Sequence, residues 1–350
     1  MMAVRCELCG SGQSHISSFL GLCPACARKP ESREIAEKAH EKSLEAFSLG
    51  YAHGSEARCT QCVNECQLDD GEKGFCGMRA NSKGRVGPVF GDDAIVDWYY
   101  DPVPTNCVAE WTCPATLEHA AGKKNLSVFF YGCSFDCLFC QNWHHREGSS
   151  ACRPKRSPGQ LLKAVDRDTY CVCFFGGDPT PQLQYAFCFC EFLVENKGDA
   201  VRICWETNGS MSSGLAARMA DFSIQTGGTV KFDLKAFDEN LHFALCGTSN
   251  KQALHNFATI AKKMRENGKG QLVASTLLVP GYVDSDEVCR IAGFIAQLDQ
   301  AIPYSLLAFH PDYLMRDLPI TTRAHALEAL AAARRAGLTN VHIGNMHLLR

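Results

Sequence analysis

Three cysteines in the stretch YGCSFDCLFC, at positions 133, 137 and 140, are spaced four and three residues apart. Structural zinc sites and most iron–sulfur clusters are held by four protein ligands. Three cysteines therefore leave one coordination position open for a cofactor or substrate. The spacing favours a 4Fe-4S cluster at Cys133, Cys137 and Cys140 over a zinc site completed by His144 or His145.

Two sets of four cysteines lie nearer the N-terminus. The paired motifs CELC and CPAC predict a zinc-ribbon-like site with the ligands Cys6, Cys9, Cys23 and Cys26. The second set is Cys59, Cys62, Cys66 and Cys76, which suits zinc marginally better than an auxiliary iron–sulfur cluster. Because this region has few apolar residues, bound metal would contribute to its folding free energy.

The composition narrows the class of protein. The 350 residues are 46% hydrophobic, as in a globular protein with a large core. Thirty-five basic and 38 acidic residues give a formal charge of −3, so neither nucleic acid nor a membrane is an expected partner. With no signal-like N-terminus and no long apolar run, we expect a cytoplasmic protein. Its 21 cysteines should then be metal ligands or buried apolar side chains rather than disulfides, with Cys107 and Cys113 the hardest to place.

The positions of apolar runs predict an α/β fold. Short β-rich runs alternate with amphipathic stretches from residue 126, which predicts a parallel sheet and a partial (β/α)6 TIM-like barrel. Strands are expected near residues 126–130, 171–175, 201–205, 230–234, 272–279 and 304–309, with a possible seventh at 341–344. Helices are expected near 31–47, 158–166, 181–196, 212–222, 250–267, 285–299 and 322–336.

Three segments follow from this pattern. Residues 1–50 should form the zinc-ribbon-like segment with one helix, and residues 51–125 the second four-cysteine site and a mostly irregular connection. Residues 126–350 should form the barrel. Polar motifs such as GGDPTP, ETNGS and HPDY follow the predicted strands. Because barrel active sites are built from the loops after the strands, these motifs should share one site.

The cysteine spacing and these motifs resemble the radical S-adenosylmethionine (radical SAM) superfamily. The resemblance implies that the open iron binds S-adenosylmethionine and that its reductive cleavage gives a 5′-deoxyadenosyl radical. It also implies a reducing electron donor and assigns no catalytic acid or base. The positions that the resemblance assigns to cofactor binding are Phe139, Gly176, Gly177, Asp178, Glu206, Thr207, Asn208, Asp233, Lys235, Pro280, Gly281 and His310.

The phrases CLFCQNWH, FGGDPTPQ and LLAFHPDY are similar to those of relatives of pyruvate formate-lyase activating enzyme. A version with an added cysteine ribbon resembles cobalamin-dependent enzymes of methanogenic archaea, which C-methylate methyl-coenzyme M reductase, notably at a glutamine. The favoured hypothesis is therefore radical C-methylation of a protein or peptide substrate. A glycyl-radical-enzyme activase without cobalamin and a non-catalytic iron–sulfur scaffold are the alternatives.

Cobalamin has no obvious binding domain in this sequence, because no Asp-x-His-x-x-Gly stretch is present to supply an axial histidine. If bound, cobalamin should lie between the N-terminal region and the barrel mouth. Trp98, Tyr99, Tyr100 and Trp111 could supply aromatic surface there. The small N-terminal domain could also dock a protein substrate over the barrel mouth.

Overall fold

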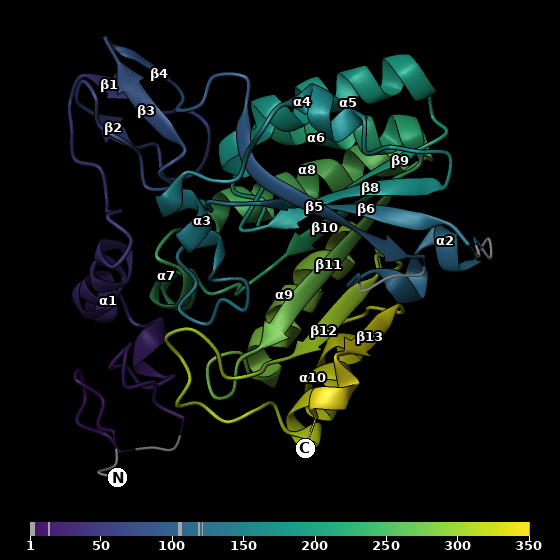
Figure 1. The fold of residues 1–350 in the computed structure, drawn as a ribbon. Helices are drawn as coiled ribbons and strands as arrows, with labels where there is room; N and C mark the ends of the chain where they lie inside the picture. The colour runs from purple at the N-terminus through teal and green to yellow at the C-terminus, as the bar shows by residue number, and fades with distance from the viewer. Residues whose placement is uncertain (1–3, 13–14, 104–106, 118–119, 121, 350) are drawn as a thin grey trace.

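The computed structural model describes residues 4–12, 15–103, 107–117, 120 and 122–349. Its centre is a nine-stranded sheet with the order β13-β12-β11-β10-β9-β8-β6-β5-β7 (Figure 1). Seven successive strands are parallel. These are β6 (Lys124–Phe130), β8 (Thr169–Gly176), β9 (Arg202–Thr207), β10 (Thr229–Asp233), β11 (Gln271–Leu278), β12 (Tyr304–Ala308) and β13 (Val341–Gly344).

Helices connect these strands in the manner of βαβ units. They are α4 (Pro158–Leu162), α5 (Leu183–Lys197), α6 (Ser213–Thr226), α8 (Lys251–Asn267), α9 (Ser285–Leu298) and α10 (Arg323–Arg335). Several begin at a side-chain cap: Asp284 accepts a hydrogen bond from the Glu287 amide, and Thr322 accepts one from the His325 amide. The predicted α/β class and the order of its units are confirmed, including the seventh strand.

Two helices of seven and eight residues were not predicted. These are α3 (His145–Ala151) and α7 (Glu239–Cys246), and each lies in a loop that follows a parallel strand. Asp238 caps α7 and Gly247 ends it in the left-handed region, with φ of +73°. Both helices contribute residues that hold the predicted site, as described below.

The prediction of a mostly irregular connection before the barrel is wrong for residues 79–102. This stretch forms the hairpin of β3 (Arg79–Ser82) and β4 (Arg85–Pro88), followed by the nine-residue strand β5 (Ala94–Pro102). Strand β5 pairs antiparallel with β6 and with the short β7 (Lys155–Arg156). The main sheet therefore includes a strand that precedes the predicted start of the barrel at residue 126. Its first three residues are buried and its later ones are not, which hides the alternation that marks a strand.

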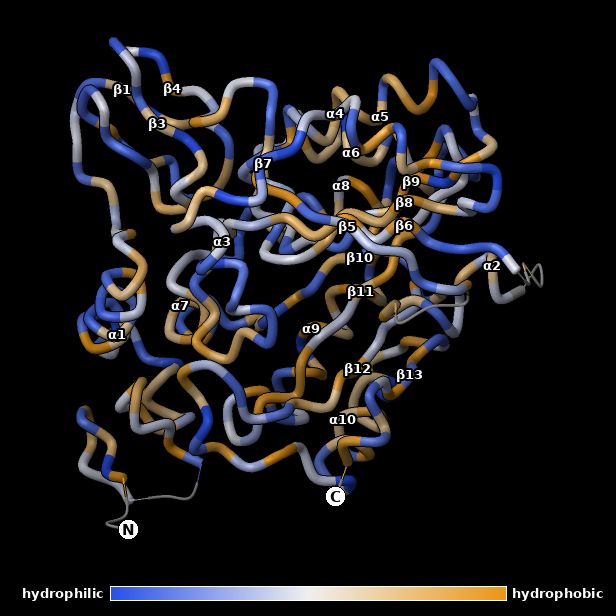
Figure 2. Tube along the Cα trace, viewed as in Figure 1, coloured by the Kyte–Doolittle hydropathy of each residue, from blue (hydrophilic) through white to orange (hydrophobic). Residues whose placement is uncertain are grey.

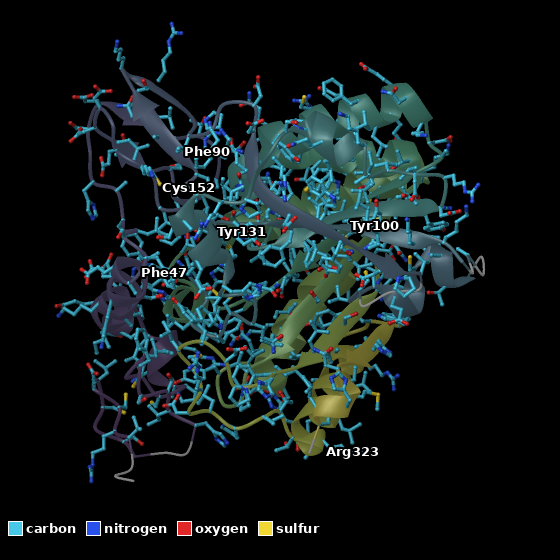
Figure 3. The ribbon with its side chains drawn as sticks, in the orientation of Figure 1. Phe47, Phe90, Tyr100, Tyr131, Cys152 and Arg323 are labelled. Carbon is cyan, nitrogen blue, oxygen red and sulfur yellow. The ribbon has the colours of Figure 1, made fainter. Side chains whose placement is uncertain are left out.

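The N-terminal region lies along one side of the sheet (Figure 1). It contains α1 (Arg33–Glu45), as predicted, and the short strands β1 (Ala57–Arg58) and β2 (Gln67–Leu68). Phe90 and Tyr131 pack against a small apolar cluster of Cys76, Met78 and Ile95, which joins this region to the sheet (Figure 3). The second cysteine set is therefore packed directly against the main sheet.

The remaining segment, 107–117, lies at the amino ends of several parallel strands. It contains the short helix α2 (Pro114–Leu117). Trp111 donates to Ser305 of β12 and stacks on His342 of β13, while Gln271 of β11 donates to the Thr112 carbonyl. These contacts cover the end of the sheet opposite to the loops that carry the polar motifs.

Apolar residues concentrate along the central strands and the facing sides of the helices (Figure 2). The largest fully buried side chains include Trp205, Phe174 and Phe232, each on a parallel strand. Within the described residues, no helix is both long enough and apolar enough to cross a membrane.

Candidate active site

The three cysteines of the first motif lie on the loop between β6 and α3 and line one cavity of about 170 Å³. Cys133 and Cys140 are partly exposed, and Cys137 is buried. Residues from the ends of β8, β9, β10, β11 and β12 line the same cavity. Because strands distant in the sheet share one cavity, the sheet must curve around it as a partial barrel does.

The thiols of this loop are costly to ionise without a metal. Burial and the nearby Asp178 carboxylate raise the pKa of Cys133, and burial together with Cys137 raises the pKa of Cys140 to about 12. The contact with Cys246, and after it burial, also raises the pKa of Cys137. Metal ligation would therefore release protons and supply the missing positive charge.

Cys246, at the end of α7, is a further thiol that contacts this loop from outside the motif. Its Sγ lies 3.5 Å from the Cys137 Sγ, but Cys246 is fully buried and does not line the cavity. It therefore stands behind Cys137 rather than at the open side of the three cysteines. Its backbone carbonyl accepts a hydrogen bond of 2.8 Å from the Asp136 amide, which ties the loop to α7.

The Asp136 carboxylate, between the first two cysteines, anchors the loop to the N-terminal helix α1. It accepts hydrogen bonds from Ser43 Oγ at 2.9 Å and from His40 Nδ1 at 2.8 Å, and it pairs with Arg146 of α3. Burial raises the pKa of Asp136, but Arg146 and His40 more than offset that effect, so the pKa lies below its ordinary value. Helices far apart in the sequence thus converge on one carboxylate beside the cysteines.

Two predicted glycines allow the loop after β8 to lie against the cysteine loop. A Cβ on Gly176, where φ is +114°, would lie 2.7 Å from both the amide nitrogen and the carbonyl oxygen of Phe130. A Cβ on Gly177 would lie 2.9 Å from the ring of His145 and closer still to the Gly132 carbonyl. Both glycines line the cavity, so they serve close packing as well as ligand access.

The Asp178 carboxylate accepts hydrogen bonds from other residues of the protein. Its carboxylate accepts hydrogen bonds from the Thr180 amide at 2.7 Å, from Thr207 Oγ1 at 3.0 Å and from the Asn208 amide at 2.7 Å. Burial raises the pKa of Asp178, although these hydrogen bonds oppose the shift. Asp178 therefore holds the loops after β8 and β9 together.

Asn208 reaches the cysteine loop directly. Its Nδ2 donates to Ser134 Oγ at 2.9 Å and lies 3.7 Å from the Cys133 Sγ. Amide groups near a cysteine ligand stabilise negative charge on the sulfur, and such contacts tune the potential of iron–sulfur clusters.

Charged residues of β9, of β10 and of the loop after β10 form another part of the wall. Asp233 pairs with Lys235, whose ammonium lies 5.6 Å from the centroid of the Phe139 ring. Burial lowers the pKa of Lys235, but Asp233 and Cys137 more than offset that effect, so the pKa is raised. The second oxygen of Asp233 is buried without a hydrogen-bond partner, and Glu206 pairs with Lys231 at 3.0 Å. The structure therefore gathers these predicted residues around the cysteine loop.

His145 is a cavity residue that the sequence suggested only as a zinc ligand. It is buried, lines the cavity, and its Nδ1 has no hydrogen-bond partner. Burial, with the Arg146 cation beside it, lowers the pKa of His145 well below its ordinary value. The sequence signal for His145 was its nearness to Cys140, five residues before it; its burial and its place in the cavity lining were not predictable from that spacing.

Three predicted residues do not belong to the described lining of this cavity, namely Pro280, Gly281 and His310. Gly281 instead faces the cysteine ribbon, since a Cβ there would lie 2.8 Å from the Cβ of His15 and 3.1 Å from Cγ of Pro24. The adjacent Tyr282 hydroxyl donates to the Leu22 carbonyl and accepts from the Ser17 amide. His310 is exposed just after β12.

The ribbon cysteines fit one metal ion. The ligand atoms of Cys6, Cys9, Cys23 and Cys26 all lie within 4.8 Å of one another. Four thiols at such distances suit tetrahedral zinc. The thiols of Cys59, Cys62, Cys66 and Cys76 also line a common, smaller space, together with Arg79 and Pro181.

The expectation that the other cysteines are plain apolar side chains is wrong for at least two of them. The Lys231 ammonium lies 3.1 Å from the Sγ atoms of both Cys107 and Cys173. A cavity of about 60 Å³ beside the first one is lined by Cys107, Cys113, Cys171, Cys173, Cys204 and Lys231, with Tyr99 among the other residues. The error arose because Cys173 stands in the apolar sequence of β8 and Cys107 in the segment before β6, while the lysine that both face lies on β10.

Comparison with known proteins agrees with this geometry. Residues 127–295 match the family described as "Radical SAM superfamily". An uncharacterized protein of Methanocaldococcus jannaschii is 27% identical over 303 residues, which cover 83% of this chain and 82% of that protein. The pyruvate formate-lyase-activating enzyme of Staphylococcus aureus is 26% identical over 192 residues, covering 52% of this chain and 73% of that enzyme.

Among solved structures, Streptococcus suis SuiB bound to its precursor peptide SuiA has a TM-score of 0.48 and 16% sequence identity. That alignment covers 62% of this chain and 47% of SuiB.

Proposed function

We propose that this chain, whose residues 127–295 match the radical SAM superfamily, is an enzyme that removes a hydrogen atom from an unactivated carbon of a protein or peptide substrate. The observation that carries the proposal is the shared cavity. Three thiols of one loop and the polar ends of four strands line a single space. A scaffold that only transfers electrons would not need that polar wall.

The donor set fits the cofactors that the family implies. Three thiols line the cavity, and Cys246, which contacts Cys137, does not line it. Two buried polar atoms in the wall, His145 Nδ1 and one oxygen of Asp233, have no partner within the protein. Unpaired buried polar atoms are costly, so a polar ligand is expected to contact them. S-adenosylmethionine carries the amino, carboxylate and ribose groups that could do so.

When bound, a 4Fe-4S cluster and S-adenosylmethionine would supply a 5′-deoxyadenosyl radical as the hydrogen-abstracting species. The protein's own residues bind, orient and exclude water. Asp136 fixes the cysteine loop, the Asn208 amide supports the sulfur of Cys133, and Phe139 offers an aromatic face for adenine. Lys235, with Asp233, places a positive charge beside the cavity where a carboxylate could bind.

Of the finer hypotheses, a glycyl-radical activase receives support from the relative whose name is pyruvate formate-lyase-activating enzyme. The reaction would remove one hydrogen atom from a substrate glycine and leave the radical on the partner enzyme. It requires nothing beyond the cavity already described. We therefore propose this activity ahead of methylation.

Cobalamin-dependent methylation of a glutamine in methyl-coenzyme M reductase is the second candidate. The segment expected to meet cobalamin does border a cavity that shares Phe175, Glu206 and Lys231 with the main one. That cavity is about 60 Å³, which is too small for a corrin ring. Trp111 donates a hydrogen bond to Ser305 and stacks on His342, so its ring is not available to a ligand. Among the residues that the structure describes, this segment therefore leaves no space for a corrin ring, and no step is assigned to cobalamin.

The test is anaerobic reconstitution with iron, sulfide and cobalamin, followed by gel filtration and metal analysis. The reduced protein is then incubated with S-adenosylmethionine, and 5′-deoxyadenosine is quantified by liquid chromatography. Formation of 5′-deoxyadenosine without retained cobalt supports the cobalamin-free reaction. Retention of about one cobalt per chain would replace it with methylation. Absence of 5′-deoxyadenosine in protein with a full cluster would overturn both.

A further inference from the structure

The second cysteine set differs from the ribbon in the spacing of its thiols. Among the described residues, only Cys6, Cys9, Cys23 and Cys26 bring three or more possible ligand atoms within 4.8 Å of each other. In tetrahedral zinc sites with Zn–S bonds of about 2.3 Å, the sulfur atoms lie about 3.8 Å apart. The set at residues 59–76 is therefore more open than a one-zinc site, as is the set at residues 133–140.

The space between these thiols suits an anionic group larger than one ion. All four cysteines line it, and Arg79 is also part of its wall. The Nε atom of Arg79 is buried and has no hydrogen-bond partner. The Phe75 amide donates to the Cys66 Sγ at 3.4 Å, a contact that stabilises charge on a ligating sulfur. A cation with an unpaired donor beside four thiols suits a metal–thiolate centre with net negative charge, and the wide spacing of the thiols favours a cluster over one zinc ion.

Two contacts join this set to the loop that carries Cys133, Cys137 and Cys140. Asn64, two residues after Cys62, donates from Nδ2 to the Ser134 carbonyl at 2.7 Å, and Ser134 follows Cys133. On the other side, Gly132 packs on the Cys76 carbonyl, which would lie 3.4 Å from a Cβ added to that glycine.

The two loops are also connected through Ser210, which contacts both of them. The Val63 amide donates to the Ser210 carbonyl at 2.9 Å, and Ser210 Oγ lies 2.6 Å from Ser134 Oγ. Each side of Cys133 is thus in contact with a segment that carries a cysteine of the second set. Such short, packed connections suit electron transfer between two buried centres.

We propose that Cys59, Cys62, Cys66 and Cys76 hold a second iron–sulfur cluster, which passes electrons to the cluster at Cys133, Cys137 and Cys140. The relay part of this proposal rests on the proposed function. A low-potential one-electron donor protein reduces the second cluster by one electron, and that electron moves to the first cluster. It then reduces the sulfonium of S-adenosylmethionine, whose C5′–S bond breaks to give methionine and the 5′-deoxyadenosyl radical. One electron is consumed for each bond broken, and no proton is transferred in this step.

The decisive variant removes the catalytic cysteines and leaves the proposed second site intact. The full chain carrying C133A, C137A and C140A is reconstituted anaerobically with iron and sulfide. Iron, sulfide and zinc are then counted per chain, and the reduced sample is examined by electron paramagnetic resonance. We expect two to four irons, about one zinc and a reducible cluster signal. Loss of all iron, with about two zincs per chain, would overturn the proposal. This readout does not depend on any reaction with S-adenosylmethionine, so it separates failure of this proposal from failure of the proposed function.

The relay is tested with C59S/C62S and, as a matched control, C289S, which changes an exposed cysteine on α9. Reduction of the catalytic cluster by a reduced two-cluster ferredoxin is followed by rapid freezing and paramagnetic resonance. We expect reduction at least ten times slower in C59S/C62S, with C289S unchanged. An unchanged rate in a folded C59S/C62S protein that has lost the second cluster would overturn the relay. If that variant does not fold, the iron count of the first variant still decides whether the site binds a cluster.

Discussion

Gly176→Ala tests how closely the loop after β8 must approach the cysteine loop. Gly176 ends β8 and pairs with Phe130, three residues before Cys133. An added Cβ would lie 2.7 Å from two backbone atoms of Phe130, where real Cβ contacts essentially never fall below 3.0 Å. The strands must therefore separate by at least 0.3 Å at this point, the difference between those two distances.

The cost has two parts. The positive φ of +114° is unfavourable for alanine by about 1–2 kcal/mol, and overpacking against backbone adds about 1–3 kcal/mol. We therefore expect the free energy of unfolding to fall by about 2–5 kcal/mol. Misplacement of reacting groups by about 1 Å can cost about 100-fold in rate, so we expect at least a roughly tenfold loss of 5′-deoxyadenosine formation.

The assay compares Gly176→Ala with Gly293→Ala after both are reconstituted to equal iron content. Gly293 lies inside α9 with nothing within 4 Å of an added Cβ, so alanine there should be neutral or slightly stabilising. Urea unfolding gives stability, and initial rates of 5′-deoxyadenosine formation give activity. Equal rates and equal stabilities for the two variants would refute the close-packing argument.

Three other changes probe the supports of the site. His40→Ala removes a partner of buried Asp136 and should lower the free energy of unfolding by about 3 kcal/mol, measured in urea, with poorer cluster retention; unchanged iron binding would contradict a role for α1 in holding the loop. Asn208→Ala removes the amide beside Cys133 and should lower the potential of that cluster by about 40 mV, from about 1 kcal/mol per hydrogen bond, in a redox titration; a raised potential would count against it. Burial lowers the pKa of His242 from its ordinary 6.5 to about 4, so the folded protein binds this proton less readily than the unfolded chain does. The free energy of unfolding should therefore fall by about 3 kcal/mol as the pH is lowered from about 6.5 to about 4. His242→Asn, which keeps a donor toward the Thr248 carbonyl, should make stability less dependent on pH across this range, and an unchanged pH dependence would show that His242 does not contribute.

The features that could be predicted from the sequence are those encoded locally. The alternation of strands and helices from residue 126 was visible because each element has its own apolar pattern. The loop motif at Cys133, Cys137 and Cys140 was visible because its three ligands stand close together in the chain. The polar residues Glu206 and Asp233 could be placed in the same cavity because parallel strands end at one edge of a sheet.

Features that depend on distant partners were not predicted. Nothing near His40 indicates that it would bond to Asp136, 96 residues away. Gly281 was expected at the cofactor, but the cysteine ribbon packs on this loop. The contact could not be predicted because the two segments are 260 residues apart at Leu22 and Tyr282. The sequence pattern places Lys231 in a strand and indicates nothing about its partners. Its contacts with Cys107 and Cys173 form only when three separate segments meet in the folded protein.

The central claim is that Cys133, Cys137 and Cys140 hold a cluster with one position open to S-adenosylmethionine. The most direct measurement is paramagnetic resonance of the reduced protein before and after S-adenosylmethionine is added, with product analysis of the same sample. A changed cluster spectrum accompanied by 5′-deoxyadenosine is the predicted result, and C133A/C137A/C140A should show neither. A spectrum that S-adenosylmethionine leaves unchanged, with no 5′-deoxyadenosine formed, would contradict the account.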